Sequence, residues 1–173
     1  IDNYSVYSMH KLSPPILETI LSSGALDLQG LICPGHVSTI TGGKVWDPLA
    51  RRYGIPSVVA GFEPLDILQA VDMICAQLEA GAPRAEIAYS RGVTWEGNLR
   101  AQEVMEEVFQ ASDANWRGVG WVPHSGLAIR EEFASFDASK RFPVTPPSSR
   151  EPSGCICGDI LRGAKAPSDC ALF

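Results

Sequence analysis

Cysteines and histidines are the residues of this chain most able to do chemistry, and they are unevenly placed. Cys155, Cys157 and Cys170 lie within segment 155–173 with the spacing C-x-C-x12-C. Thiolates grouped in this way suit soft metals, so the spacing predicts zinc or an iron–sulfur cluster. Such clusters usually take four ligands, and this segment supplies three. Free or disulfide-linked cysteines are the alternative interpretation.

A second candidate pair consists of Cys33, the last residue of the apolar run that begins at Gly30, and His36, which follows that run. A short apolar run that ends at Pro34-Gly35 predicts a buried strand followed by a loop. Ligands bind outside the carboxyl ends of parallel strands, where this pair would lie. Two functional interpretations fit this pair: the two side chains coordinate a metal, or the imidazole activates the thiol. A buried strand cysteine beside a backbone-bonded histidine is the structural alternative.

Three carboxylates, Glu63, Asp66 and Glu96, lie near the ends of predicted strands, where each could act as an acid, and Glu96 is taken with Cys33 and His36 as a candidate catalytic residue. Glu63 and Glu96 precede predicted helices, where the N-terminal dipole favours a carboxylate in any case. Two common catalytic motifs are missing from the sequence. Gly42-Gly43-Lys44 lacks the rest of a phosphate-binding loop, and no G-x-S-x-G occurs.

The composition restricts the class of protein. The chain has 173 residues, of which 45% are hydrophobic and 20% charged, as in an ordinary folded domain. A net charge of −6 without a stripe of Lys and Arg argues against a nucleic-acid partner. No apolar run approaches the ~20 residues that span a bilayer. We find no secretion signal, and clustered cysteines without one predict a reducing, cytoplasmic compartment.

The hydrophobic pattern alternates between strands and helices. Apolar runs and turn residues predict strands over 3–9, 30–33, 55–61 and 116–122, with an extended segment within 82–96. Helices are expected from an N-cap at Ser13, over 44–53, from Pro64 to Gly81, from an N-cap at Asn98, and over 127–137.

Two of these helices have apolar residues at helical spacing, which predicts the faces that they bury. The first face comprises Leu65, Leu68, Val71, Cys75 and Leu78, and Cys75 is expected to be a small core residue. The second comprises Ala101, Val104, Met105, Val108 and Phe109.

This order of elements predicts an α/β fold, a parallel-sheet lobe with helices on both faces, over residues 1–141. Residues 142–154 are rich in Pro and Ser and predict a semi-rigid linker. The remaining segment, 155–173, has too few apolar residues for a core and is expected to need a metal or a cross-link.

Five ordered blocks resemble the HypD family of hydrogenase maturation factors. They are Leu31–Gly42 (LICPGHVSTITG), Val59–Gln69 (VAGFEPLDILQ), Glu96–Asn98 (EGN), Ser125–Glu132 (SGLAIREE) and Cys155–Phe173 (CICGDILRGAKAPSDCALF). The resemblance runs through nearly all of the chain. It implies two α/β lobes and a small iron–sulfur domain in the complete protein, of which this chain would be a fragment without the first lobe and its C-P-x-C pair.

The resemblance also implies a function. Family members act as scaffolds for the Fe(CN)2CO unit of nickel–iron hydrogenases, a transient iron cargo. They work with a HypC-type chaperone and a HypE-type cyanide donor, and they reach the hydrogenase large subunit indirectly. Redox steps are thought to pass between a 4Fe-4S cluster and cysteine thiols, so the resemblance favours a metal-assembly scaffold with redox activity over a conventional enzyme.

Site residues follow from the same resemblance. Cys155, Cys157 and Cys170 match the first three cluster ligands, and the fourth would lie past Phe173. Four other residues match the motif that faces the central cleft of the family: Pro34, Gly35, His36 and Ser38. Glu96 and Asn98 match a further family motif.

Two other classes of function remain open from the residues alone. One is a cytosolic iron–sulfur redox enzyme that uses Cys33 and His36 on a small molecule. The other is a zinc-stapled α/β binding module.

Overall fold

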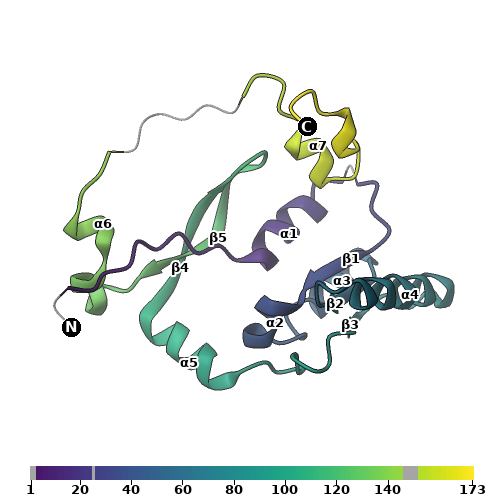
Figure 1. Ribbon diagram of the computed structural model, residues 1–173, viewed down its shortest axis with the longest axis horizontal. Helices are drawn as coiled ribbons and strands as arrows, with labels where there is room; N and C mark the ends of the chain where they lie inside the picture. The colour runs from purple at the N-terminus through teal and green to yellow at the C-terminus, as the bar shows by residue number, and fades with distance from the viewer. Residues whose placement is uncertain (1–2, 25, 146–151) are drawn as a thin grey trace. The chain divides into compact units, whose positions relative to one another are not determined.

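The computed structural model describes residues 3–24, 26–145 and 152–173. The chain divides into two compact units. Residues 27–104 form the first, which we call the parallel-sheet unit. Residues 1–26 and 105–173 form the second, which we call the hairpin unit. The elements of both are labelled in Figure 1.

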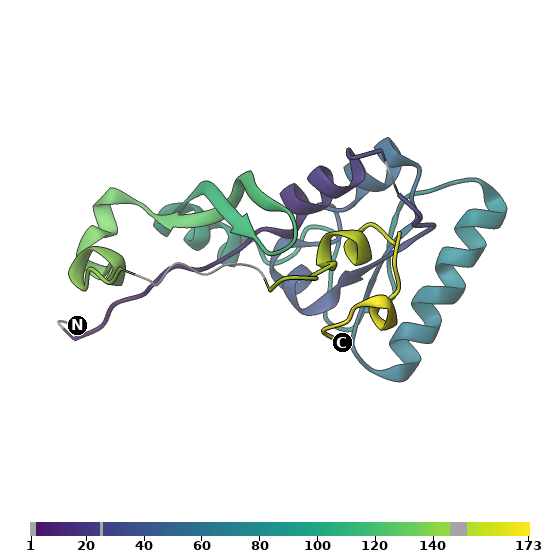
Figure 2. The same ribbon diagram turned by 90° about the horizontal axis from the view of Figure 1, so that it is seen from above.

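The parallel-sheet unit is built on three strands in the order β1-β2-β3, namely Leu31–Pro34, Ser57–Ala60 and Ala85–Ile87. Both pairs are parallel, which confirms the predicted α/β class with a parallel sheet. Helices α2 (Gly35–Thr41), α3 (Asp47–Tyr53) and α4 (Pro64–Ala80) connect the strands, and α5 (Leu99–Val108) follows. Figure 2 shows α4 beside the sheet, where it packs on β1 and β2.

The core of this unit lies between β2 and α4. The strand is buried along its whole length, because a central parallel strand is covered on both faces. Val58 and Ala60 of β2 pack with Ala70 of α4 and with Ala88. Burial of this kind contributes roughly 25 cal/mol for each Å² of apolar surface removed from water.

Local chemistry sets the helix ends, much as the sequence predicts. Gly54 (φ 65°) and Gly81 (φ 59°) adopt the left-handed conformation that ends α3 and α4. The Asn98 side-chain oxygen accepts a hydrogen bond from the Ala101 N–H at 3.0 Å, so Asn98 caps α5 as expected. The first helix, α1 (Ser13–Leu21), differs: Ser13 is its first residue, and the N-cap is Leu12, which makes no side-chain cap bond.

The hairpin unit contains a twisted antiparallel pair, β4 (Phe109–Trp116) and β5 (Gly120–Ile129). Helix α1 packs on β5 through Ile16, Ile20 and Val122. The remaining elements are the short 3-10 helices η1 (Glu131–Phe136) and η2 (Pro167–Asp169), with α6 (Ala138–Arg141) and α7 (Cys157–Leu161).

Several predicted elements of the hairpin unit are wrong. Residues 116–122 contain the turn of the hairpin, where Gly118 and Gly120 have positive φ. The helix expected over 127–137 is instead the end of β5 followed by η1. Residues 3–9 form no strand, and Val6 makes a single bridge to Asp137. Pairing between segments distant in the sequence decides these assignments, and a local pattern cannot show it.

In the parallel-sheet unit, the loop expected after Cys33 is helix α2. Within 82–96 only Ala85–Ile87 is a strand. The predicted buried faces of α4 and α5 are both wrong. The α4 residues at those positions, Cys75 included, are exposed, and α5 contains no buried residue.

The predicted boundary at 142–154 stays a prediction, and residues 146–151 of that linker lie outside the described residues. Over the parts of the chain that the structure describes, the helices are too short or too polar to cross a membrane.

Candidate functional site

The three parallel strands end at one edge of the sheet, and a group of polar and aromatic side chains follows them. His36 comes two residues after β1, Phe62 and Glu63 follow β2, and Tyr89 and Arg91 follow β3. We call these residues, together with Asp66 in the first turn of α4, the edge cluster. Parallel strands place their carboxyl ends together, so residues from distant segments converge here.

His36 lies in the first turn of α2 and is exposed. Its imidazole ring meets the ring of Phe62 edge-on, with centroids 4.8 Å apart, and that of Tyr89 at 5.8 Å. Gly35 permits this position, because a Cβ there would come 2.3 Å from the Ala60 carbonyl oxygen. The predicted residue His36 is therefore presented to solvent at the sheet edge between two aromatic rings.

Arg91 connects the acidic members of the edge cluster. Its Nη1 and Nη2 lie 2.7 Å from Oδ1 and Oδ2 of Asp66, a bidentate pair, and Nη2 lies 2.6 Å from Oε2 of Glu63. The guanidinium also covers the ring of Tyr89 at 4.4 Å. Planar guanidinium can make these contacts together, whereas the ammonium of a lysine cannot.

This pairing shifts the titration of both partners. The hydrogen bonds from Arg91 hold the pKa of Asp66 below its usual range, although burial of the carboxylate opposes the shift. The same contacts hold the pKa of Arg91 above its usual range. The edge cluster therefore keeps the carboxylate of Asp66 charged at this edge of the sheet.

Cys33, the other half of the predicted pair, is in a different setting. The residue is 2% exposed in β1, opposite Val59 of β2. Burial raises the pKa of its thiol to about 12, and a hydrogen bond with Ser57 offsets only part of that rise. A neutral, covered thiol is a poor nucleophile and a poor metal ligand, so the geometry favours a structural role for Cys33.

Ser38 is also buried, and it holds α2 in place. Its hydroxyl donates to the Pro34 carbonyl oxygen at 2.8 Å and accepts from the Trp46 indole N–H at 3.0 Å. Pro34 ends β1 and is the N-cap residue of α2. Pro34, Gly35 and Ser38 thus set the turn from strand to helix that presents His36.

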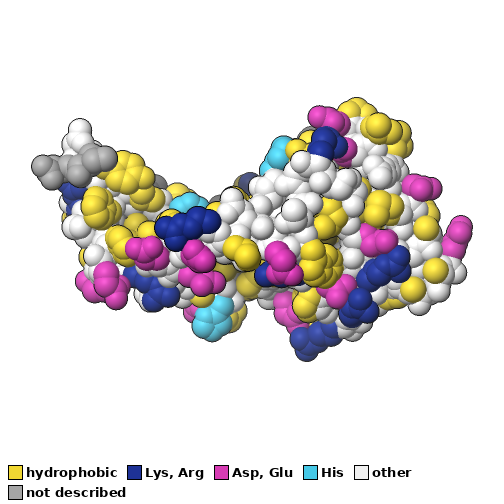
Figure 3. Space-filling model, turned by 90° about the horizontal axis from the view of Figure 1, so that it is seen from below, with side chains coloured by type: hydrophobic (Ala, Val, Ile, Leu, Met, Phe, Trp, Pro, Cys, Tyr) yellow, Lys and Arg dark blue, Asp and Glu magenta, His cyan; other side chains and the backbone are white. Residues whose placement is uncertain are grey.

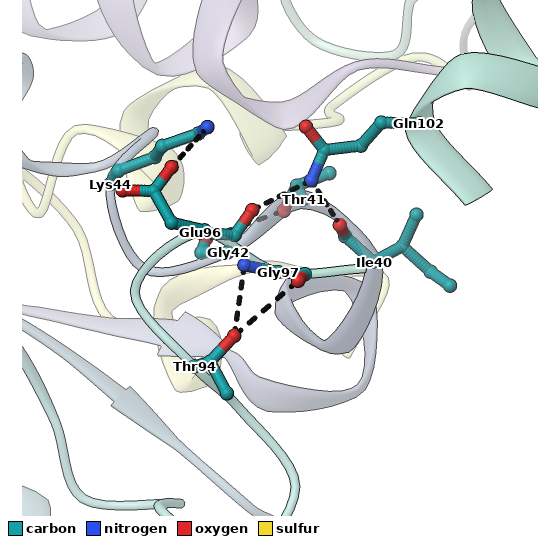
Figure 4. Close-up of polar contacts among 8 residues, drawn as sticks. All are labelled: Ile40, Thr41, Gly42, Lys44, Thr94, Glu96, Gly97 and Gln102. Carbon is teal, nitrogen blue, oxygen red and sulfur yellow. Dashed lines mark hydrogen bonds and ion pairs between the residues drawn. The ribbon is translucent and has the colours of Figure 1, made fainter. Parts of the chain in front are cut away.

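Glu96 lies on a second loop, which Figure 4 shows packed against the end of α2. Its carboxylate, 59% exposed, pairs with Lys44 at 2.7 Å. The Gln102 amide donates to the carbonyl oxygens of Ile40 at 2.7 Å and of Glu96 at 2.8 Å. These bonds hold the loop, while the Glu96 side chain stays in solvent.

Two glycines make this packing possible. A Cβ at Gly97 would come 2.3 Å from the Ile40 carbonyl oxygen, and one at Gly42 would come 2.3 Å from that of Trp95. Both residues have positive φ, 75° and 81°. We call this backbone contact the glycine contact, and it accounts for the glycines of the two sequence blocks that meet here.

Two of the C-terminal cysteines lie close together. The sulfur atoms of Cys155 and Cys157 are 3.2 Å apart, with Cys157 at the start of α7. A hydrogen bond with Cys155 raises the pKa of Cys157, and burial and the charges of Cys155 and Cys170 act in the same direction. The Arg117 guanidinium opposes them. Among the described residues, no three His, Cys, Asp or Glu side chains are arranged to hold one metal ion.

Comparison with known proteins identifies the family. The HypD family model, described as "Hydrogenase formation hypA family", matches residues 1–173. This chain belongs to the HypD family. Its sequence is 46% identical over 179 residues to the hydrogenase expression/formation protein HupD of Azotobacter chroococcum mcd 1. It is 42% identical over 180 residues to the hydrogenase maturation factor HypD of Cupriavidus necator.

These alignments cover all of the present chain but only 47% and 48% of the two relatives. The chain therefore spans about half the length of the curated HypD proteins that it matches. The resemblance found in the sequence is confirmed at the level of the family.

Sequence reasoning missed part of the edge cluster. It identified His36 and the carboxylates Glu63 and Asp66, but not Phe62, Tyr89 or Arg91. Segment 82–96 gave a weak strand pattern, so the end of β3 was not located. A search for charged and aromatic residues just after the third strand would have found Tyr89 and Arg91.

The glycine contact predicts an unequal cost for two glycine substitutions. In Gly97→Ala the new Cβ clashes with backbone, and the residue must also keep a positive φ that alanine disfavours. In Gly54→Ala only the positive φ is unfavourable, because no atom lies within 4 Å of the new Cβ. We expect Gly97→Ala to lower the free energy of unfolding by roughly 2 to 4 kcal/mol, and Gly54→Ala by about 1 kcal/mol. Urea unfolding of both variants measures the difference. Equal losses would refute the glycine contact.

The Asp66–Arg91 pair predicts a component of stability that depends on pH. A carboxyl whose pKa falls on folding stabilises the fold above its ordinary pKa near 4 and loses that contribution as the pH falls through the folded value. Asp66→Asn should therefore flatten the decline of unfolding free energy below about pH 5. Urea unfolding at a series of pH values measures this slope. Asp72→Asn removes an exposed carboxylate of the same helix and serves as the control; an identical change in both variants would contradict the assignment.

Proposed function

We propose that this chain acts in hydrogenase maturation as part of a scaffold on which the Fe(CN)2CO unit is assembled. The observation that carries the proposal is its match to the HypD family over residues 1–173. The proposal includes a HypC-type chaperone and a HypE-type cyanide donor as partners, and a cytoplasmic setting in which the cysteines stay reduced.

The edge cluster supports a role for His36 in handling the iron cargo. An exposed imidazole is a common ligand for iron. The Phe62 and Tyr89 rings hold the imidazole in place, and Arg91 occupies the nearby carboxylates of Asp66 and Glu63. His36 is thus the exposed borderline ligand at this edge, while Cys33 is covered.

The C-terminal cysteines form the second part of the proposal. The three thiols of Cys155, Cys157 and Cys170 are of the donor type that holds a 4Fe-4S cluster, and such a cluster takes a fourth ligand besides these three. Thiolates this close repel one another, and a bound cation relieves that repulsion. A cluster held there would exchange electrons. The three cysteines and the short helix α7 would supply its binding site.

Substitutions at His36 and Cys33 test the scaffold. In cells whose own copy of the protein carries His36→Ala, we expect hydrogenase activity to fall by at least about tenfold. Cys33→Ala removes a small covered thiol and should leave most of the activity. Hydrogenase activity of cell extracts is measured, with protein abundance as the control. Full activity with His36→Ala at normal abundance would overturn the role of His36.

Metal content tests the cysteine set. The complete protein purified without oxygen should contain iron and acid-labile sulfide in near-equal amounts, and Cys157→Ala should lose most of both because a ligand is removed. Cys75→Ala removes an exposed cysteine outside the set and should change neither. Elemental analysis and a sulfide assay measure the result. Zinc alone would instead support a zinc-stapled binding module, and no metal would leave the cysteines a structural role.

A further inference from the structure

Helix α4 has apolar side chains on two opposite sides. One side packs on the core of the parallel-sheet unit through Ile67, Ala70, Met73 and Ile74. A helix that is hydrophobic all round is normally covered on both sides. In this chain only one side of α4 is covered by the sheet.

The uncovered side has five apolar residues three or four positions apart, which we call the α4 stripe: Leu65, Leu68, Val71, Cys75 and Leu78. Leu65 is 75% exposed and Leu68 67% exposed, and Cys75 is also exposed. Phe62, 70% exposed, lies just before the helix. Figure 3 shows one face of the molecule, on which hydrophobic side chains (yellow) lie among acidic (magenta) and basic (dark blue) ones. An exposed apolar surface of this extent marks an interaction site.

Charge indicates the kind of partner. Segment 64–80 contains Asp66, Asp72 and Glu79 and no Lys, Arg or His. Asp66 is buried and paired with Arg91, whereas Asp72 and Glu79 are exposed beside the α4 stripe. A surface that covers the stripe therefore meets two carboxylates at its border, and basic side chains complement them.

The same charges disfavour a second copy of this chain. The α4 stripe runs from residue 65 to residue 78, so its midpoint lies at residues 71 and 72. In a two-fold symmetric pair of stripes, Asp72 would face Asp72 of the copy. Like charges in direct opposition destabilise such a pairing.

We propose that the α4 stripe binds an amphipathic helix of another protein, one with a leucine-type face bordered by Lys or Arg. The spacing of three and four residues matches the ridges that one helix offers to another. An apolar face bordered by charge of one sign is the usual basis of helix recognition. This proposal stands on α4 alone and does not depend on the role of His36 or on the cysteine set.

A pair of designed peptides tests the proposal on the complete protein, where failure of both peptides to bind would mean that the rest of the protein covers the α4 stripe. Each has about 18 residues, enough to run along α4, with leucines on one face. One borders that face with lysines and the other with glutamates. We expect the lysine peptide to bind, as measured by fluorescence anisotropy, and the glutamate peptide to bind at least about tenfold more weakly.

Variants of the chain locate the binding. Leu65→Ser with Leu68→Ser should weaken binding of the lysine peptide by about tenfold or more. Val144→Ser, at a residue 70% exposed and outside α4, should not. Asp72→Asn with Glu79→Gln should weaken binding and reduce its salt dependence. Glu106→Gln with Glu107→Gln changes the net charge equally on α5 and serves as the control.

Each outcome decides the proposal. Equal affinity for the two peptides would overturn it, and so would equal losses of affinity for the lysine peptide in the α4 variants and the control variants. A dimer of the chain, observed by sedimentation and disrupted by Leu68→Ser, would also overturn it. The substituted residues are exposed, so thermal midpoints should stay unchanged. Should the leucine variant unfold, the Asp72 and Glu79 variant still tests the proposal through its salt dependence.

Discussion

The bidentate pair of Asp66 and Arg91 is the interaction on which the sheet edge depends. It joins the first turn of α4 to the segment that follows β3, two regions connected only through the intervening helix and strand. Its guanidinium also positions Glu63 and the ring of Tyr89. Because Tyr89 in turn contacts His36, the exposed imidazole lies against packing that begins at an ion pair whose carboxylate is buried.

The family blocks of the sequence acquire separate physical roles in this arrangement. The block around His36 makes a turn from strand to helix in which Gly35 allows close backbone approach and Ser38 fills a buried polar position. The block around Glu96 packs its backbone on the end of that same helix. The first block thus presents the His36 side chain, and the second supports the helix that carries it. Sequence similarity alone does not separate these two roles.

The elements that could be predicted from the sequence are those governed by local chemistry. Gly54, Gly81 and Asn98 act within one helical turn, and the helix ends they predict are present. Strand β4 could not be found in this way, because Ala111, Ser112 and Asn115 have little preference for strands and are held by β5. The spacing of the apolar residues in α4 shows that the segment is a helix with apolar sides. It does not show which of those sides the sheet covers. Arg91 was missed because a charge pair between distant segments leaves no local pattern.

The division of the chain has a consequence for how the protein folds. The parallel-sheet unit is one continuous segment, 27–104, inserted between the two parts of the hairpin unit. Ile16 and Ile20 of α1 are synthesised before the inserted unit, and their partner Val122 is synthesised only after it. Contacts between segments so far apart form slowly, because the intervening loop must first be closed. Compaction of the parallel-sheet unit shortens that loop, so we infer a folding order in which α1 waits as a solvated segment until β5 has left the ribosome.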